Sequence, residues 1–449
     1  MTQPHPDTER RLGRYSTTAI VVANMIGAGI FTTSGIMAGQ LPASGWVLLC
    51  WILGGMIALA GALCYAELAT RMPEVGGEYL YLKTLFHPAL GWLSGWTSFF
   101  VGFSAPIAAS AIGFAAYLLA GLLNLVPAWQ FLNSAWVQPA MATIIIAIFT
   151  AIHYVGLKVG AAVQNVLTII KILIVLGLSV LGWIGSSMHP ITFSTVTTPA
   201  TGTLLGFGTA MMLVMFSFSG WNASSYIAGE VKNPRKNLPF SLIAGTLVVM
   251  LLYLMVNIFI FQSAPYEVLQ GKIAVAETAL QHSVGPVITK WLSVLVSLAL
   301  LSSLSAFILI GPRVYYAMAK DRLFFAYAAQ IHSKYKVPSR SILIQGLAAI
   351  VMVHLGTFEQ LLIYIGFALG IFPWLAILGL FKARKMGIGD ETAVKTLGFP
   401  YTPLFYLFAS LTLLIVAFIN RPLESSAALI TITLGLVFYY FWQRKTRAT

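Results

Sequence analysis

The sequence has few charged residues and only two cysteines. Charged side chains make up 9% of its 449 residues, whereas a soluble domain has roughly 25%. Cys50 and Cys64 both fall in one hydrophobic run, and on a helix they would lie about 21 Å apart. A soluble protein is therefore excluded, and so is a disulfide between these two cysteines.

Motifs for nucleotide or metal chemistry are also missing. There is no phosphate-binding glycine loop followed by Lys-Ser/Thr, no His-Glu-x-x-His segment, and the seven histidines lack ligand spacing. The net charge of +13 would favour nucleic acid in a soluble protein, but the chain has no soluble domain to carry a basic face. We expect no metal, no cofactor and no enzymatic activity.

Long hydrophobic runs dominate the sequence. Hydrophobic residues make up 58% of the chain and the mean hydropathy is +0.86. A helix needs about 20 apolar residues to cross some 30 Å of hydrocarbon. Twelve such runs predict an all-α integral membrane protein with twelve transmembrane helices. They cover residues 16–38, 45–70, 90–120, 134–156, 158–184, 204–229, 238–262, 286–319, 339–356, 358–381, 402–420 and 423–442.

The basic residues lie almost entirely on one side of this predicted topology. If the N terminus is cytoplasmic, 22 of the 26 lysines and arginines are on the inner side. Only Lys272, Lys290 and Arg421 lie outside, and Lys171 falls within a span. The positive-inside rule therefore predicts cytoplasmic tails at 1–15 and 443–449. No cleavable signal segment is evident, so we expect the first span to remain in the membrane.

Two spans are interrupted near their middles, the first at Gly27-Ala28-Gly29 and the sixth around Gly220 and Asn222. An unpaired peptide group in hydrocarbon costs several kcal/mol, so such breaks persist where they line a cavity. Freed N–H groups suit a carboxylate, and freed carbonyls suit an ammonium group or a metal cation. An amino acid carries both a carboxylate and an ammonium group.

The two breaks open two blocks of similar length. Residues 16–184 hold spans 1–5, residues 204–382 hold spans 6–10, and residues 402–442 hold spans 11 and 12. Because five spans are an odd number, the second block is inverted relative to the first, which predicts a 5+5 inverted repeat with the binding site between the broken helices. The alternative is that these glycines only permit close helix packing.

Lys171 lies in the middle of span 5, roughly 20 Å along the helix from Lys158. Its side chain cannot reach the membrane surface, so it must find partners in the bundle interior. The carbonyls of the first break are the expected acceptors. The ammonium would then occupy the place of a sodium ion, which predicts sodium independence. Proton coupling through a depressed pKa and a purely bracing role remain alternatives.

Several segments together resemble the amino acid-polyamine-organocation superfamily, and most closely the bacterial relatives of the L-type amino acid transporters. The resemblance implies a leucine-transporter-type fold with discontinuous helices 1 and 6, alternating access, and sodium-independent exchange or facilitated transport of amino acids in the bacterial inner membrane. No heavy-chain partner is implied, because the loop after span 3 lacks the pairing cysteine. The segments are Gly27-Ala28-Gly29-Ile30-Phe31, Tyr65-Ala66-Glu67-Leu68, 73–79, Ser219-Gly220-Trp221-Asn222, 230–239, and Gln164 with Lys171.

The resemblance also implies a substrate site at the two breaks. Backbone N–H groups around Ala28, Gly29 and Ile30 would hold the carboxylate. Carbonyls near Ala23, Ile26, Phe216 and Ser219 would hold the amino group. Phe216 would close over the substrate, Asn222 would brace the sixth-span break, and Trp374 would lie near the side-chain pocket. Gly27 and Gly220 complete this set of predicted residues.

The sequence favours neutral amino acids as substrates, because spans 1, 3, 6 and 8 carry no acidic residue at mid-membrane depth. A cationic amino acid or polyamine antiporter remains an alternative, since an aromatic face can bind a cation without a carboxylate. A non-transporting amino acid sensor and a channel have less support, because the tails are short and no span has a polar stripe. Glu67 and Glu230 are predicted to pair with Arg or Lys at one end of the bundle.

Overall fold

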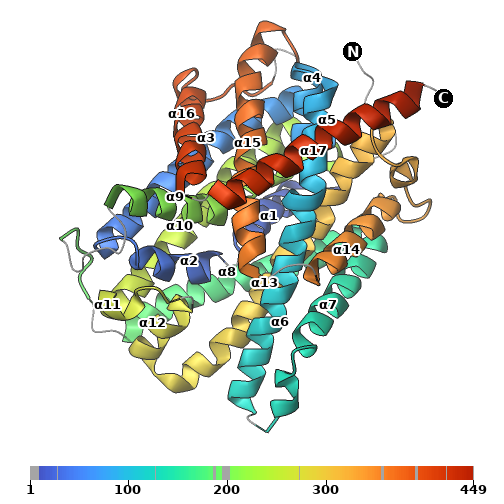
Figure 1. The fold of residues 1–449 in the computed structure, drawn as a ribbon. Helices are drawn as coiled ribbons and strands as arrows, with labels where there is room; N and C mark the ends of the chain where they lie inside the picture. Colours follow the sequence, from blue (N-terminus) through green and yellow to red (C-terminus); the bar gives the residue numbers. More distant parts are fainter. Residues whose placement is uncertain are drawn as a thin grey trace.

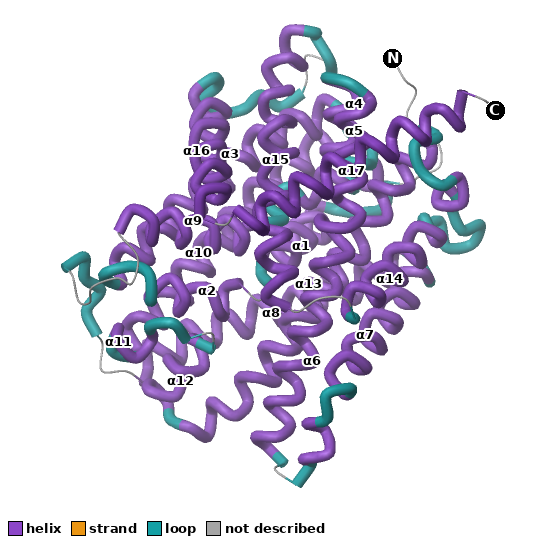
Figure 2. Tube along the Cα trace, in the orientation of Figure 1, coloured by secondary structure: helices purple, strands orange, loops and turns teal. Residues whose placement is uncertain are grey.

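The computed structural model consists of helices joined by loops (Figure 2). It describes residues 10–27, 29–126, 128–185, 189–194, 203–272, 274–354, 358–389, 393–420 and 422–447. Within these ranges the only β-type backbone pairing is two isolated β-bridges, Leu12 with Val231 and Val75 with Ile227. The all-α class predicted from the sequence is therefore confirmed for the described residues.

A helix covers most of each of the twelve predicted segments. The first half contains α1 (Arg14–Met25), α2 (Gly29–Ala38), α3 (Ser44–Arg71), α4 (Glu78–Leu85), α5 (Pro88–Thr97), the π-helix η1 (Ser98–Ser104), α6 (Ala105–Leu125), η2 (Gln130–Asn133), α7 (Val137–Tyr154) and α8 (Leu157–Gly185). The second half contains α9 (Thr203–Phe218), η3 (Ala223–Tyr226), η4 (Ala228–Glu230), α10 (Pro234–Ser263), α11 (Tyr266–Leu269), α12 (Val275–Val284), α13 (Pro286–Lys320), η5 (Ala326–Ala329), α14 (Ser339–Val353), α15 (Phe358–Lys385), α16 (Tyr401–Asn420) and α17 (Pro422–Arg447).

Length and hydropathy identify the helices that can cross a membrane. Nine spans among the described residues qualify, counting α1 with α2 as one span. The helices at Leu204–Phe218 and Ser339–Val353 are apolar but shorter. The structure thus has the helices of a multi-pass membrane protein, and twelve crossings remain a prediction.

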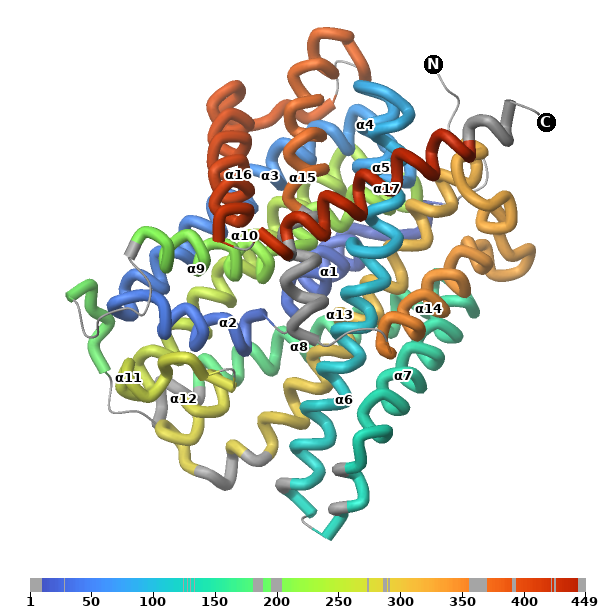
Figure 3. The backbone as a smooth tube through the Cα atoms, in the orientation of Figure 1, coloured from blue at the N-terminus to red at the C-terminus, as the bar shows by residue number. Residues whose placement is uncertain are grey.

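The broken first span lies at the centre of the bundle (Figures 1 and 3). Helix α1 contacts α8, α10 and α13, and α2 contacts α9. Helix α17 runs along the outside, in contact with α5 and α15. Ile26 in the first span is fully buried, whereas Phe408 on α16 and Phe441 on α17 are 76% and 66% exposed. Large apolar side chains facing outward suit a surface covered by lipid rather than water.

The third predicted span contains a π-helical turn, η1, between α5 and α6. Pro106, just inside α6, has no N–H to donate, and its ring would clash with the carbonyl four residues earlier in a regular α-helix. The wider turn of η1 accommodates this proline. Its residues Ser98, Gly102 and Phe103 line the central cavity described below.

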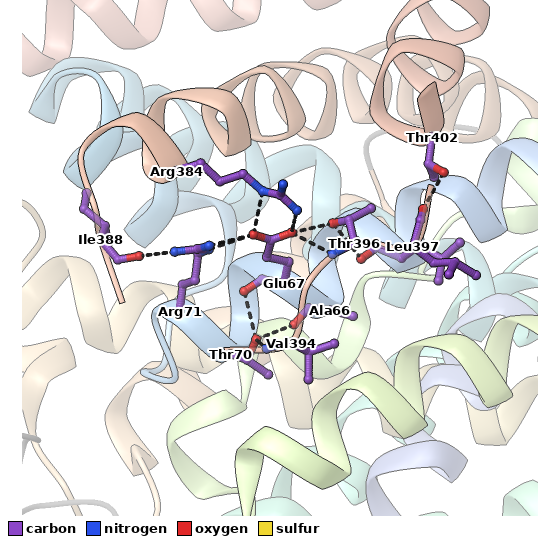
Figure 4. A network of polar contacts seen from close by, with 11 residues as sticks. Ala66, Glu67, Thr70, Arg71, Arg384, Ile388, Val394, Thr396, Leu397 and Thr402 are labelled. Carbon is purple, nitrogen blue, oxygen red and sulfur yellow. Dashed lines mark hydrogen bonds and ion pairs between the residues drawn. The ribbon is translucent and has the colours of Figure 1, made fainter. Parts of the chain in front are cut away.

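A buried carboxylate ties α3 to α15 at one end of the bundle (Figure 4). Glu67 accepts hydrogen bonds from Arg384 Nη2 at 2.6 Å and from Arg71 Nε at 2.9 Å. The backbone N–H and the hydroxyl of Thr396 donate to the same carboxylate at 2.7 and 2.8 Å. The predicted pairing of Glu67 with basic residues is confirmed, and it fastens the loop before α16 to α3.

The second predicted pair lies between η4 and α13. Arg313 donates to Glu230 through two parallel bonds of 3.1 Å, and both side chains are almost completely buried. The main chain beside this pair also joins the N-terminal segment. Arg11 N and Leu12 N donate to Glu230 O at 2.9 Å, and Lys232 N donates to Leu12 O at 2.8 Å. The segment before α1 is therefore fixed to the segment after the second helix break.

Candidate functional site

The first hydrophobic span is divided into α1 and α2. Helix α1 ends at Met25, and the next residue, Ile26, has an extended backbone with φ −73° and ψ 95°. Helix α2 begins at Gly29. The last carbonyls of α1 and the first N–H groups of α2 therefore lack partners within their own helices. Ala28, one of the predicted site residues, lies outside the described residues.

The sixth span is broken in a comparable place. Helix α9 ends at Phe218, and the chain continues through a turn into the short 3₁₀ helices η3 and η4. Gly220 in this turn has φ +95°, a conformation that is costly for residues with a Cβ atom. The glycine thus permits the turn that ends the helix.

The two breaks lie directly against each other. A Cβ atom added to Gly29 would come within 2.4 Å of Ser217 Oγ, and one added to Gly220 would come within 2.8 Å of Asn24 Cβ. Each break therefore packs a glycine against the other broken span. Even a methyl group at either position would push the spans apart.

Tyr253 of α10 contacts both helix breaks. Its hydroxyl lies 2.6 Å from Met25 O and 2.9 Å from Ser217 O. It can donate to one of these carbonyls at a time, and both belong to turns whose intrahelical partners are incomplete. A single buried hydroxyl thereby couples the end of α1 to the end of α9.

Replacing Gly220 with alanine is expected to reduce the yield of folded protein severely. The residue has a positive φ, and its new Cβ would lie 3.0 Å from the Asn24 carbonyl carbon, which is backbone and cannot rotate away. Gly177→Ala in α8 is the matched control, because nothing lies within 4 Å of its added Cβ. Fluorescence-detected size exclusion of both variants checks the prediction, and equal monodisperse peaks would contradict it.

Lys171 of α8 lies against the first break. Its Nζ donates to Ala23 O at 3.0 Å, to Ile26 O at 2.5 Å and to Ser303 Oγ at 2.7 Å. Ser303 in turn donates to Ile26 O at 2.8 Å. The ammonium group is fully buried and all three of its protons have acceptors. A positive charge is favourable at the carbonyl end of a helix, which is where α1 places it.

A cavity of about 330 Å³ opens beside the paired breaks. That volume is in the range of small-molecule sites. The cavity continues along α2 to Gln40 and along α9 to Thr209, and it reaches α6, α13, α15 and α16. Most of its wall is apolar, and polar side chains at the breaks include Asn24, Ser219 and Asn222. Such a cavity can enclose a small zwitterion with an uncharged side chain.

The predicted site residues fall into two groups. Those that line the cavity are Gly27, Gly29, Phe216, Ser219, Gly220 and Asn222. Ile30 is buried in the core outside this lining. Trp374 is also absent from the lining, because its indole Nε1 donates to Leu407 O at 2.9 Å and fixes α15 to α16. Its neighbour Pro373 faces the cavity instead.

Comparison with known proteins identifies the family. Residues 12–439 match the family model described as amino acid permease. The chain belongs to the amino acid permease family. The resemblance to the amino acid-polyamine-organocation superfamily is thereby confirmed, and this permease is a multi-pass membrane transporter by family and by its apolar helices.

Curated relatives align with the permease over nearly its whole length. The serine/threonine exchanger SteT of Bacillus subtilis is 27% identical over 441 residues, covering 97% of this chain and 98% of that protein. The mouse b(0,+)-type amino acid transporter 1 is 28% identical over 438 residues, covering 97% and 88%. The human Asc-type amino acid transporter 1 is 25% identical over 453 residues, covering 98% and 84%. All three are named as amino acid transporters or exchangers.

Several residues of the site were not among the predicted site residues. Ser217 and Tyr253 connect the breaks, and Ser303 completes the coordination of Lys171. Glu78 lines the cavity although it lies in the loop region between two spans. The Gly76-Gly77 pair before Glu78 is the sequence signal for a tight approach at this point, but it does not identify the partner.

Proposed function

We propose that this permease is a sodium-independent transporter of mainly neutral L-amino acids that works by alternating access, as an exchanger, a facilitated carrier or a proton-coupled carrier. The observation that carries the proposal is the contact of Lys171 Nζ with Ala23 O and Ile26 O. A fixed ammonium group already neutralises the carbonyls of the first break, so no sodium ion is needed there. The relatives named above support amino acid transport as the general activity.

The substrate backbone would bind between the two breaks. Its carboxylate would accept from the N–H groups that begin α2, at Ala28, Gly29 and Ile30, where the helix dipole favours an anion. Because Lys171 occupies the carbonyls of Ala23 and Ile26, the amino group would donate to carbonyls of the sixth span. Phe216 and Ser219 supply these acceptors, and both residues line the cavity.

The broken helices also support a topology. Helices α1 and α2 open the first block of five spans, and α9 with η3 opens the second. We infer twelve crossings arranged as a 5+5 inverted repeat, with both termini in the cytoplasm and the chain in the bacterial inner membrane. The excess of lysine and arginine on one side supports this orientation.

A cationic amino acid or polyamine antiporter is the second candidate function. The observation in its favour is Glu78, whose carboxylate lies in the cavity lining and could attract a positively charged side chain. Three donors already surround this carboxylate. Neutral substrates therefore remain the first expectation, and a substrate panel separates the two candidates.

Purified permease in proteoliposomes tests these proposals by counterflow. Vesicles preloaded with unlabelled serine, threonine, alanine, leucine, arginine, ornithine or putrescine are diluted into the labelled compound, with sodium or choline as the external cation. We expect uptake of neutral amino acids above that of protein-free vesicles, with equal rates in sodium and choline. Absence of counterflow with every compound would contradict transport, and dependence on sodium would contradict the role of Lys171.

A further inference from the structure

Glu78 is a buried carboxyl group at the edge of the cavity. It is the first residue of α4, which follows α3 in the chain and packs against α5 and α15 (Figure 1). Its side chain is only 4% exposed, and it lines the same cavity as Gly27 and Gly220. A carboxyl group in this position is costly to bury as an anion unless its partners compensate for lost water.

The hydrogen-bond partners of Glu78 are all neutral. Tyr65 Oη donates to Oε1 at 2.8 Å, Asn222 Nδ2 to Oε1 at 2.5 Å, and Tyr226 Oη to Oε2 at 2.8 Å. By contrast, the buried carboxylates Glu67 and Glu230 are each bonded to arginine. Burial without a cationic partner raises the pKa of the Glu78 carboxyl group. The three hydrogen bonds lower this pKa, but by less than burial raises it.

The groups facing Glu78 keep its surroundings uncharged. Tyr65 comes from α3, Tyr226 from η3 and Tyr406 from α16, and Tyr81 is on α4 itself. Tyrosine hydroxyls are neutral at physiological pH. Two nearby lysines have partners other than Glu78. Lys83 of α4 pairs with Asp321 after α13, and Lys382 of α15 stacks on Phe86.

Glu78 is also connected to the second helix break. Asn222 and Tyr226 belong to the segment that follows Gly220. The loop before α4 is docked on this segment, because Gly76 N donates to Tyr226 O at 3.1 Å. A Cβ on Gly77 would lie 2.4 Å from the Tyr226 ring. Any movement of η3 relative to α4 therefore changes the surroundings of the carboxyl group.

The Glu78 carboxyl group itself has hydrogen-bond partners in both protonation states. The anion accepts all three hydrogen bonds. The protonated acid can donate from Oε2 to Tyr226 Oη, because the tyrosine hydroxyl proton is free to rotate. Tyr226 Oη already lies 3.3 Å from Asn222 Nδ2 and can accept there. Uptake of a proton by Glu78 thus requires the Tyr226 hydroxyl to rotate away from Oε2.

We propose that Glu78 is a proton-binding site that couples proton movement to amino acid transport. It binds a proton from the cavity as the cavity closes around the substrate, and it releases the proton on the other side when the contact of η3 with α4 opens. This inference rests on the proposed transport function. It assigns the proton to Glu78 rather than to Lys171, whose Nζ already contacts three oxygen atoms at the first break.

Transport driven by a pH gradient tests the proposal. Vesicles at internal pH 7.5 are diluted to external pH 6.5 or 7.5, with a transported amino acid as substrate and an uncoupler as reference. One pH unit supports up to about tenfold accumulation at one proton per substrate. We expect wild-type initial uptake to rise about threefold to tenfold in the acidic medium, because external acid increases the protonated fraction of Glu78.

Glu78→Gln keeps the shape of the side chain but cannot bind the proton. We expect slower but measurable counterflow, with stimulation by the pH gradient reduced to less than about 1.5-fold. Glu277→Gln is the matched control. Glu277 is on α12 outside the cavity, and burial also raises the pKa of its carboxyl group. It should retain the wild-type pH response, so loss of stimulation in both variants would overturn the assignment.

A tyrosine variant tests the same site without removing the carboxyl group. Tyr226→Phe removes a donor to the anion, so the midpoint of the pH profile of uptake should move to higher pH. Tyr266→Phe is the control, because its hydroxyl contacts Ala38 O and Leu41 O at the far end of α2. It should leave the midpoint unchanged, and equal midpoints in both variants and wild type would count against Glu78.

The failure of this inference is distinguishable from that of the proposed function. Counterflow of amino acids without any response of the wild type to the pH gradient would overturn the proton site and leave transport intact. Absence of counterflow under every condition would overturn transport itself. Full stimulation in Glu78→Gln would show that another group carries the proton.

Discussion

Lys171→Ala is expected to reduce amino acid exchange by at least about 100-fold while the protein still folds. The variant loses the three donors to Ala23 O, Ile26 O and Ser303 Oγ. A hydrogen bond to a charged group contributes about 1.5–3 kcal/mol. A loss of about 2.7 kcal/mol in the step that switches the carrier corresponds to a 100-fold change in rate. Folding should persist because Tyr253 and the contacts with α10 still hold α1.

Counterflow in proteoliposomes, normalised to monodisperse protein, measures this effect. Lys158→Ala is the matched control, because Lys158 is on the same helix but exposed. It should exchange at the wild-type rate. If Lys171→Ala also exchanges within about threefold of the wild type, the lysine serves only to brace the bundle.

Breaking the Glu230–Arg313 pair is expected to give the largest loss of stability. The two side chains are 4% and 2% exposed, and they are joined by parallel bonds of 3.1 Å. Removing one partner leaves the other charge buried without compensation, which costs about 3–5 kcal/mol. We therefore expect Glu230→Ala and Arg313→Ala each to lower the thermal unfolding midpoint in detergent by several degrees.

The double variant Glu230→Leu/Arg313→Met tests whether the loss of stability in the single variants comes from the unpaired buried charge. Replacing both charges with apolar groups is often neutral, so it should recover most of the stability lost in either single variant. Lys83→Ala breaks the more exposed pair with Asp321 and should cost less than about 1 kcal/mol. Single variants at positions 230 and 313 that unfold at the wild-type midpoint would refute the prediction.

The central part of the fold could be predicted because it has strong local signals. A glycine pair inside an apolar run indicates a break, and the structure ends α1 at Met25 and begins α2 at Gly29. A lysine in the middle of a span has few options, and the predicted contact of Lys171 with the carbonyls of the first break is present. Both inferences follow from the cost of unpaired polar groups in hydrocarbon.

Other parts of the site depend on tertiary contacts that leave little signal in the sequence. Glu78 and Asn222 are far apart in the chain, and the loop that brings the carboxyl group to the cavity lies between spans. Searching only the spans for acidic residues therefore missed it. The contact of Trp374 with α16 likewise has no signal in the sequence, because an aromatic residue near a cavity can equally pack on the neighbouring helix.

The short backbone pairing between Leu12 and Val231 has a mechanical consequence. Leu12 precedes α1 by two residues, and Val231 follows η4 directly, so the pairing joins the start of the first broken span to the end of the sixth. Three hydrogen bonds and the Glu230–Arg313 pair are concentrated at this joint. The halves α1 and η3–η4 therefore cannot swing independently. Helix α1 and the segment η3–η4 must move together, or the backbone hydrogen bonds between Leu12 and the segment 230–232 must break first.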